Sequence, residues 1–211
     1  MKYCAVITAA GCSSRMGTFK PVLPVAGRPA IIHLTENLFA AGVSHIVVVT
    51  GFRSDLLQEL LQNHPGITTV HNPDYQTTQM FDSAKIGLQA VPDEYDQVLL
   101  IPVDIPFVRE DTIRKIIRTD ADLVFPSYQM RRGHPLKIHR KYIPHLLQYE
   151  GTNGLRGALN ALPAEPSYVV VDDPFIIRDM DTPQDYQTLL QEYRHQEDFR
   201  DDNAAFHVEL P

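Results

Sequence analysis

The chain is poor in three features that would each point to a particular class of protein: cysteine, long apolar runs and an excess of basic side chains. Cys4 and Cys12 lie too close together, and too near one expected strand, to build a disulfide framework, and their spacing matches no zinc site. We therefore expect two reduced thiols in a cytoplasmic protein. No run approaches the roughly 18 apolar residues of a spanning helix, which predicts that the protein does not use a membrane.

Acidic side chains outnumber basic ones. Nineteen Lys and Arg against 26 Asp and Glu give a net charge of −7, which argues against broad binding to nucleic acid or anionic lipid. A site for a phosphate group must then be local. The first eleven residues run directly into a loop of small residues without a cleavage region, so they predict a buried strand rather than a signal peptide.

Apolar strands and amphipathic helices alternate through the first half of the 211 residues. Strands buried on both faces and separated by helices are typical of a mostly parallel sheet. We predict an α/β protein, a Rossmann-like three-layer α/β/α sandwich, in one domain over residues 1–195. The expected strands are Tyr3–Thr8, His45–Thr50, Ile67–Val70 and Gln97–Ile101. The expected helices are Ala30–Ala41, Asp55–Asn63 with Ser54 as its cap, and Met80–Ala90.

The second half has a less regular pattern, and we expect it to fold over the C-terminal edge of the same sheet. Tyr128–Ile138 is polar, basic and irregular. The closing helix is expected over Thr182–His195, with Thr182 or Asp181 as its cap. We expect residues 196–211 to form an acidic, flexible tail. The other expected elements are helices at Thr112–Arg118, Lys141–Tyr149 and Asn153–Leu162, and strands at Leu123–Pro126, Tyr168–Val171 and Phe175–Ile177.

The strongest functional signal is the segment TAAGCSSRMGTFK, which follows the first strand. Small residues let backbone N–H groups approach a polyphosphate, and Arg15 and Lys20 would lie beside it. The spacing is neither that of a P-loop nor the GxGxxG dinucleotide fingerprint. The alternative interpretation is a turn of small residues with two surface cations. The residues expected to contact a nucleotide are Ala9, Ala10, Gly11, Ser13, Ser14, Arg15, Gly17 and Lys20.

This loop resembles the signature loop of nucleotidyltransferases that activate sugars, alcohol phosphates and molybdopterin. Its TAAG-S-S-RMG form is most similar to the molybdenum cofactor cytidylyltransferases of the MobA-like NTP transferase family. Four further segments follow in the family's order, so that the resemblance covers about residues 1–190. They are VTGFR at Val49–Arg53, HNPDY at His71–Tyr75, GHP at Gly133–Pro135 and IRDMDTPQDY at Ile177–Tyr186. The resemblance implies the nucleotide-diphospho-sugar transferase fold.

Two acidic segments are candidate metal ligands. Asp104 follows a strand in IPVDIP, where a carboxylate suits Mg²⁺, although a turn or cap role is an equal alternative. The resemblance implies that Asp104 binds the metal, with Val103 in place of the family's usual glycine. It also nominates Asp181 as a second metal carboxylate or a substrate-positioning acid. Asp179 and Asp181 alternate along an extended segment, so we expect only one of them to face the site.

The resemblance also assigns walls to the site. Asn72, Met80 and Ser83 would surround the nucleobase and ribose, although Gln79–Ser83 replaces the family's glycine- and serine-rich run. The AAG form of the loop favours a pyrimidine. Arg132 and His134 would bind the acceptor, although a solvated arginine and a hydrogen-bonded histidine are the plainer interpretations.

The mechanism implied is in-line attack of an acceptor phosphate on the α-phosphorus of CTP, with release of pyrophosphate. Positioning and charge neutralisation by Arg15, Lys20 and Mg²⁺ on Asp104 would carry the catalysis. Molybdopterin is the favoured acceptor and a molybdoenzyme a possible partner. Alternatives are transfer to a sugar phosphate or alcohol phosphate, and a non-catalytic molybdopterin carrier. A dehydrogenase is disfavoured because the dinucleotide fingerprint is absent.

Overall fold

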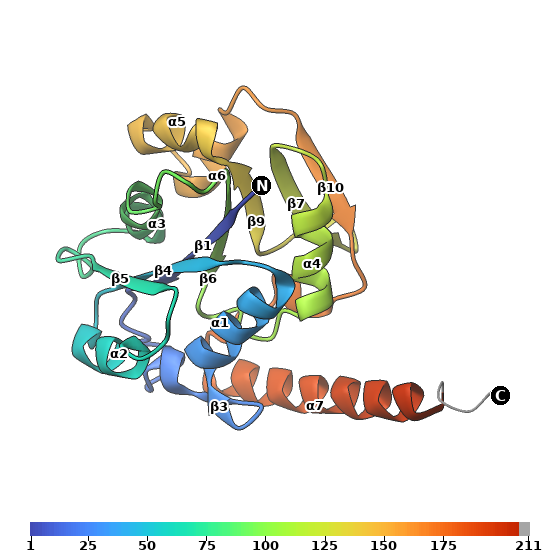
Figure 1. Cartoon of the computed structure of the whole chain (residues 1–211). Coiled ribbons are helices and arrows are strands. Elements are labelled where there is room, and N and C mark those ends of the chain that lie inside the picture. The colour runs from blue at the N-terminus through green and yellow to red at the C-terminus, as the bar shows by residue number, and fades with distance from the viewer. Residues whose placement is uncertain (207–211) are drawn as a thin grey trace.

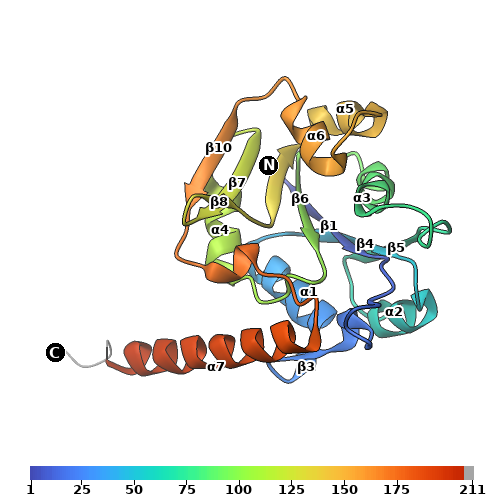
Figure 2. The same ribbon diagram turned by 180° about the vertical axis from the view of Figure 1, so that it is seen from behind.

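A computed structural model describes the backbone of residues 1–206 and the side chains of residues 1–196. One twisted sheet runs through the middle of the molecule with helices on both sides, and a long helix at the C-terminus extends away from it (Figures 1 and 2). The order in the sheet is β10-β7-β9-β6-β1-β4-β5, and β8 pairs with β7. The strands are β1 (Tyr3–Ala9), β4 (His45–Thr50), β5 (Ile67–His71), β6 (Gln97–Pro102), β7 (Leu123–Tyr128), β8 (Arg131–Arg132), β9 (Leu136–His139) and β10 (Pro166–Val170).

The central strands are parallel and buried on both faces. β1 pairs in parallel with β4 and with β6, and the pairs Ala9↔Thr50 and Thr8↔Pro102 bring their C-terminal ends to one edge of the sheet. β9 runs antiparallel to both of its neighbours. Strands that pack helices on both faces need apolar side chains in both directions, which the run HIVVVT of β4 supplies. The predicted three-layer, mostly parallel α/β fold is confirmed.

Alternate residues of the central strands point into two apolar layers. Ile7 and Val48 pack in the layer of α1 (Ala30–Ala41), α2 (Ser54–Leu61) and α4 (Glu110–Arg118). Val6 and Val49 pack in the layer of α3 (Met80–Gln89), α5 (Ile143–Gln148) and α6 (Gly154–Asn160). The two layers of helices hold the sheet rigid, so loops at its C-terminal edge have a fixed base.

The last described helix, α7 (Pro183–Phe206), runs eleven residues beyond the expected end at His195. No Gly or Pro occurs between residues 184 and 206 to interrupt it. Its first turns place Tyr186, Leu189 and Tyr193 in an apolar cluster with Phe107 and Phe175, and the hydroxyl of Tyr186 donates to the carbonyl of Pro24 in the short hairpin β2 (Pro24–Val25) and β3 (Arg28–Pro29). The predicted flexibility of the acidic tail stays a prediction, and residues 207–211 lie outside the described part. In the range that is described, no helix is both long and apolar enough to cross a membrane.

Three local expectations are wrong. Phe175–Ile177 is not a strand but part of the 3-10 helix η3 (Pro174–Ile177), because Asp173 accepts a hydrogen bond from the backbone N–H of Phe175 and Pro174 favours a helical start. Ser54 does not cap α2, since it is the first helical residue and follows Arg53 at φ 52°. Lys141–Tyr149 divides into the 3-10 helix η2 (Arg140–Tyr142) and α5.

The second half of the chain also differs from the expectation that it folds over the sheet edge. Within Tyr128–Ile138, read from the sequence as irregular, β8 and β9 form, and with β7 and β10 they widen the sheet instead. β9 is only four residues long, too short for its apolar Leu136 and Ile138 to stand out in the sequence, and its Lys137 is 1% exposed and donates to the carbonyl of Thr119. The segment after η3 does reach the C-terminal edge, where the N–H of Met180 donates to the carbonyl of Asp104 at 2.9 Å.

Candidate active site

A cavity of about 220 Å³ opens at the C-terminal ends of β1 and β6. The loop after β1 and the turn after β6 line it together because those strands are hydrogen-bonded neighbours. Eight of the predicted site residues meet here: Ala9, Ala10, Gly11, Ser13, Lys20, Met80, Ser83 and Asp104. The rest of the lining is Thr8, Pro21, Tyr75, Thr78, Gln79, Pro102 and Val103.

The loop after β1 holds Lys20 in place. Ser13 has a positive φ of 54°, and its carbonyl accepts hydrogen bonds from the N–H groups of Met16 and Gly17 at 3.1 and 3.2 Å. Its Oγ accepts from the N–H of Lys20 at 3.2 Å. Gly17 has φ 68°, a conformation that other residues rarely adopt. Ser14 is exposed and does not line the cavity.

Lys20 lies between two carboxylates that come from distant parts of the chain. Its Nζ is 2.7 Å from Oδ1 of Asp181 and 3.4 Å from Oδ2 of Asp104, and its side chain is only 11% exposed. Arg15, which is 72% exposed, approaches the other side of Asp181 with Nη1 at 2.8 Å from Oδ2. The tertiary structure thus joins the loop after β1, the turn after β6 and the segment before α7 through ion pairs.

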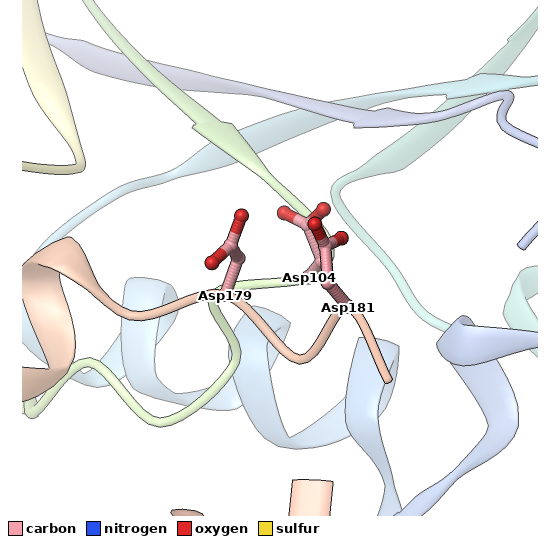
Figure 3. A group of neighbouring side chains, drawn as sticks. All are labelled: Asp104, Asp179 and Asp181. Carbon is pink, nitrogen blue, oxygen red and sulfur yellow. The ribbon is translucent and has the colours of Figure 1, made fainter. Parts of the chain in front are cut away.

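The acidic cluster contains a third carboxylate. Oxygen atoms of Asp104, Asp179 and Asp181 all lie within 4.8 Å of one another, and Figure 3 shows the three side chains directed to one region from two segments. The expectation that only one of Asp179 and Asp181 faces the site is wrong. The segment that carries them is irregular rather than a strand, so its side chains do not alternate.

The cap of α7 leaves Asp181 available to the site. The N–H and Oγ1 of Thr182 donate to Oδ2 of Asp185, and the N–H of Asp185 donates back to Oγ1 of Thr182 at 3.2 Å. This reciprocal pair is a capping box. Of the two expected caps, Thr182 therefore takes the role, and the carboxylate of Asp181 is left to Lys20 and Arg15.

Burial and charge shift the two partly buried carboxyls in opposite directions. Burial raises the pKa of Asp104, an effect that Lys20 opposes and Asp179 and Asp181 reinforce. The hydrogen bond from Lys20 lowers the pKa of Asp181. Carboxylate oxygens grouped in this way are the ligands that hard divalent cations prefer, so the donor set fits Mg²⁺ or Mn²⁺.

Asn72 supports the wall of the cavity from behind. It is 1% exposed, and its Nδ2 donates to Thr78 Oγ1 and Ser83 Oγ at 3.0 Å each, while its Oδ1 accepts from the N–H of Asp74 at 3.0 Å. Its side chain is fully used in fixing the loop after β5 and does not line the cavity. Ser83, by contrast, is both its partner and part of the lining.

Three residues after β5 that line this cavity, Tyr75, Thr78 and Gln79, were not predicted as nucleotide contacts. Tyr75 packs against Gly51 so closely that a Cβ there would lie 2.7 Å from Tyr75 Cβ and 2.6 Å from the carbonyl oxygen of Ala10. Gly51 thus lets three loops meet. Gly51 in the VTGFR segment was the available signal, and no contact was predicted for it.

A second cavity of about 620 Å³ adjoins the first and contains the two predicted acceptor residues, Arg132 and His134. Met80 lines both cavities. The guanidinium of Arg132 lies 4.8 Å from the ring centroid of Phe125 and 5.0 Å from that of Tyr168. The full lining is Met80, Phe125, Met130, Arg131, Arg132, Gly133, His134, Leu136, Leu155, Arg156, Leu159 and Asn160.

His134 is held at the base of this second cavity. The backbone N–H of His134 donates to the carbonyl of Ile176 at 2.8 Å, and the ring nitrogen Nδ1 lies 3.3 Å from the carbonyl oxygen of Leu100. Burial lowers its pKa, so the imidazole is neutral at neutral pH. Among the residues of this cavity, Arg156 was not predicted, because it lies on a short helix without a recognisable motif.

One known protein family matches most of this chain in sequence. The sequence profile of the MobA-like NTP transferase domain matches residues 5–166. The chain belongs to the MobA-like NTP transferase family. It is 33% identical over 190 residues to the molybdenum cofactor cytidylyltransferase of Escherichia coli K12, covering 89% of this chain and 95% of that protein. The predicted family and nucleotidyltransferase class are therefore confirmed.

Solved structures share the fold at lower identity. Rv0371c of Mycobacterium tuberculosis H37Rv superposes with a TM-score of 0.78 at 22% identity over 90% of this chain and 99% of that chain. A second crystal structure of Rv0371c, a complex with manganese, gives a TM-score of 0.72 at 20% identity over 90% and 99%. A nucleotidyl transferase from Methanothermobacter thermautotroptrophicus gives 0.76 at 22% identity over 92% and 99%. These likenesses bear out the predicted nucleotide-diphospho-sugar transferase fold.

Proposed function

We propose that this nucleotidyltransferase transfers CMP from CTP to the phosphate of molybdopterin, with Mg²⁺ bound and pyrophosphate released. The observation that carries the proposal is the ammonium of Lys20, 2.7 and 3.4 Å from two carboxylates at the edge of a cavity lined by a loop of small residues. The similarity to the Escherichia coli molybdenum cofactor cytidylyltransferase supports the choice of nucleotide and acceptor.

The loop after β1 would bind the triphosphate. Ala10 and Gly11 line the cavity, and backbone N–H groups of small residues can approach phosphate oxygens closely. The guanidinium of Arg15 pairs with Asp181 at the edge of the site. Because the Arg15 side chain is exposed, the guanidinium can turn from there to the β- and γ-phosphates. Lys20 is buried deeper and would neutralise the α-phosphoryl oxygens as charge develops in the transition state.

The carboxylates would hold the metal. We assign Mg²⁺ to Asp104 and Asp181, and the position of Asp179 places a third carboxylate beside them. A divalent ion bound there would supply charge neutralisation at the phosphate oxygens. Lys20 and Arg15 keep Asp181 ionised, so this ligand is ready to bind a cation at neutral pH.

The nucleobase would lie against the wall formed after β5. Ser83 lines this cavity, and Asn72 orients Ser83 from behind. Ala9 and Ala10 line the same cavity, and their Cβ atoms would leave less room for the base than glycine would. A smaller space supports a pyrimidine over a purine. We further propose that the functional domain is residues 1–195, that the protein acts in the cytoplasm, and that it hands its product to a molybdoenzyme.

The test is pyrophosphate release with Mg²⁺ for CTP, GTP, ATP and UTP, each paired with molybdopterin and with a panel of sugar and alcohol phosphates. We expect release with CTP and molybdopterin, and loss of release in Asp104→Asn. Release only with another pair would keep the chemistry and replace the substrate. Tight nucleotide binding without release for any pair would instead establish a molybdopterin carrier.

A further inference from the structure

The second cavity is basic in an otherwise acidic protein. Arg131, Arg132 and Arg156 line it, and no Asp or Glu among the side chains that the structure describes does so, whereas the chain as a whole carries a net charge of −7. Cations gathered without acidic partners create a local positive potential, which attracts a ligand with negative charge. The cavity is therefore suited to an anionic molecule.

The uncharged lining is mostly apolar. Among the described residues that line the cavity, the neutral polar side chains are those of His134 and Asn160, and Gly133 contributes backbone alone. A sugar has a hydroxyl on most ring carbons, and each needs a hydrogen-bond partner when water is removed. Flat heteroaromatic rings instead gain from contact with aromatic and methionine side chains. The apolar lining residues are Met80, Phe125, Met130, Leu136, Leu155 and Leu159.

Arg156 comes from a helix that packs against α3, and the first residue of α3 lines both cavities. That helix is α6, and its first residue, Gly154, approaches α3 so that a Cβ there would be 3.7 Å from Phe81 Cβ. Met80, the residue before Phe81, lines both cavities. The cavity that Arg156 lines therefore shares a wall with the nucleotide cavity, so an acceptor held in it would lie beside the nucleotide.

The guanidinium of Arg156 is not used by the fold. It is exposed, and among side chains 1–196 no hydrogen bond or ion pair engages it. Arg132 differs, because its guanidinium lies over Phe125 and Tyr168 and donates to the hydroxyl of Tyr168. Arg132 is thus a fixed part of the wall, whereas all five N–H donors of Arg156 are available to a ligand.

We propose that Arg156 binds the phosphomonoester of the acceptor, so that the flat ring system of the molybdopterin named in the proposed function would lie against the apolar wall of the second cavity. This inference rests on the proposed function and specifies the acceptor by its chemistry. Arg156 acts as a binding and specificity residue: a forked guanidinium can donate two parallel hydrogen bonds to one phosphate.

The experiment measures binding to the full chain of 6-hydroxymethylpterin monophosphate and of the same pterin without phosphate, by pterin fluorescence anisotropy. Glucose 1-phosphate is tested as a competitor, and CTP binding is measured separately by calorimetry. The variants are Arg156→Gln and Arg156→Lys, with Arg118→Gln as a matched control. Arg118 is also exposed, lies at the end of α4 and lines neither cavity.

We expect Arg156→Gln to weaken binding of the pterin phosphate about tenfold or more, and to change binding of the unphosphorylated pterin and of CTP by less than about twofold. The affinity of Arg156→Lys for the pterin phosphate should lie between those of the wild type and Arg156→Gln. Lysine keeps the positive charge but loses the forked pair of N–H donors. Equal weakening of both pterins, or weakening of CTP alone, would overturn the role of Arg156. Tighter binding of glucose 1-phosphate than of pterin phosphate would overturn the heteroaromatic acceptor. Either failure is distinguishable from failure of the proposed function, because pyrophosphate release by the wild-type chain is measured separately from pterin binding.

Discussion

Replacing Lys20 with Met tests the central electrostatic feature of the site. The change keeps the length of the side chain and removes an ammonium that is 2.7 Å from Asp181 and 3.4 Å from Asp104. If Lys20 neutralises charge that develops on the α-phosphate, its loss should remove one buried, charge-assisted donor from the transition state. Loss of one such donor typically costs about 2.7–4 kcal/mol, so we expect kcat to fall about 100- to 1,000-fold.

The binding of CTP should fall much less than kcat. Arg15 and the backbone of the loop remain, and in the ground state the α-phosphate carries less charge for Lys20 to neutralise. We would measure kcat by pyrophosphate release and the CTP dissociation constant by calorimetry, with Lys115→Met, an exposed position on α4, as the matched control. Equal losses in kcat and in CTP affinity would show that Lys20 contributes only to ground-state binding, and unchanged kcat would refute its role entirely.

Three further predictions concern the surroundings of the site. Asn72→Ala should lower the thermal midpoint and raise KM for CTP, because buried hydrogen bonds to Thr78 and Ser83 are lost, each worth about 0.5–1.5 kcal/mol; unchanged KM with lower stability would leave Asn72 a purely structural role. Thr182→Ala should remove the cap of α7 and cost about 0.5–2 kcal/mol of unfolding free energy in urea titrations, and no loss would contradict the capping box. Burial lowers the pKa of His33 in the folded chain, so the unfolded chain takes up the proton more readily once pH falls below about 6.5. The thermal midpoint should therefore fall as pH decreases below about 6.5. It should fall less steeply in His33→Gln than in the wild type or in the exposed control His195→Gln.

Helices and strands with a strong period were predictable from local sequence. The predicted strands at the centre of the sheet match β1, β4 and β6 within one residue at each end. The predicted helix Ala30–Ala41 has the same bounds as α1, which ends at Gly42 with φ 112°. Apolar runs and glycine stops are short-range signals, so they need no knowledge of distant contacts.

Two short elements of the second half were missed. β9 was missed because it is only four residues long and is held by pairing with β6 and β7; its Lys137 is buried, and the ammonium donates to the carbonyl of Thr119. The short helix η3 was taken for a strand because its buried residues Phe175 and Ile176 resemble a strand core in sequence. The partners of β9 are strands distant in the chain, whereas η3 is set by its neighbours Asp173 and Pro174, a local signal that was missed.

The sequence by itself determined the chemistry that is available: a small-residue loop with Arg15 and Lys20 after the first strand, and acidic residues near two later elements. Only the tertiary structure decided which of these groups meet. It brought Asp179 and Asp181 to the same side of an irregular segment beside Asp104, and it joined Asp104 and Asp181 to Lys20, which lies 84 and 161 residues earlier in the chain. The physical reason is that side-chain direction outside regular structure follows from packing, whereas residue type and strand position are fixed locally by composition and period.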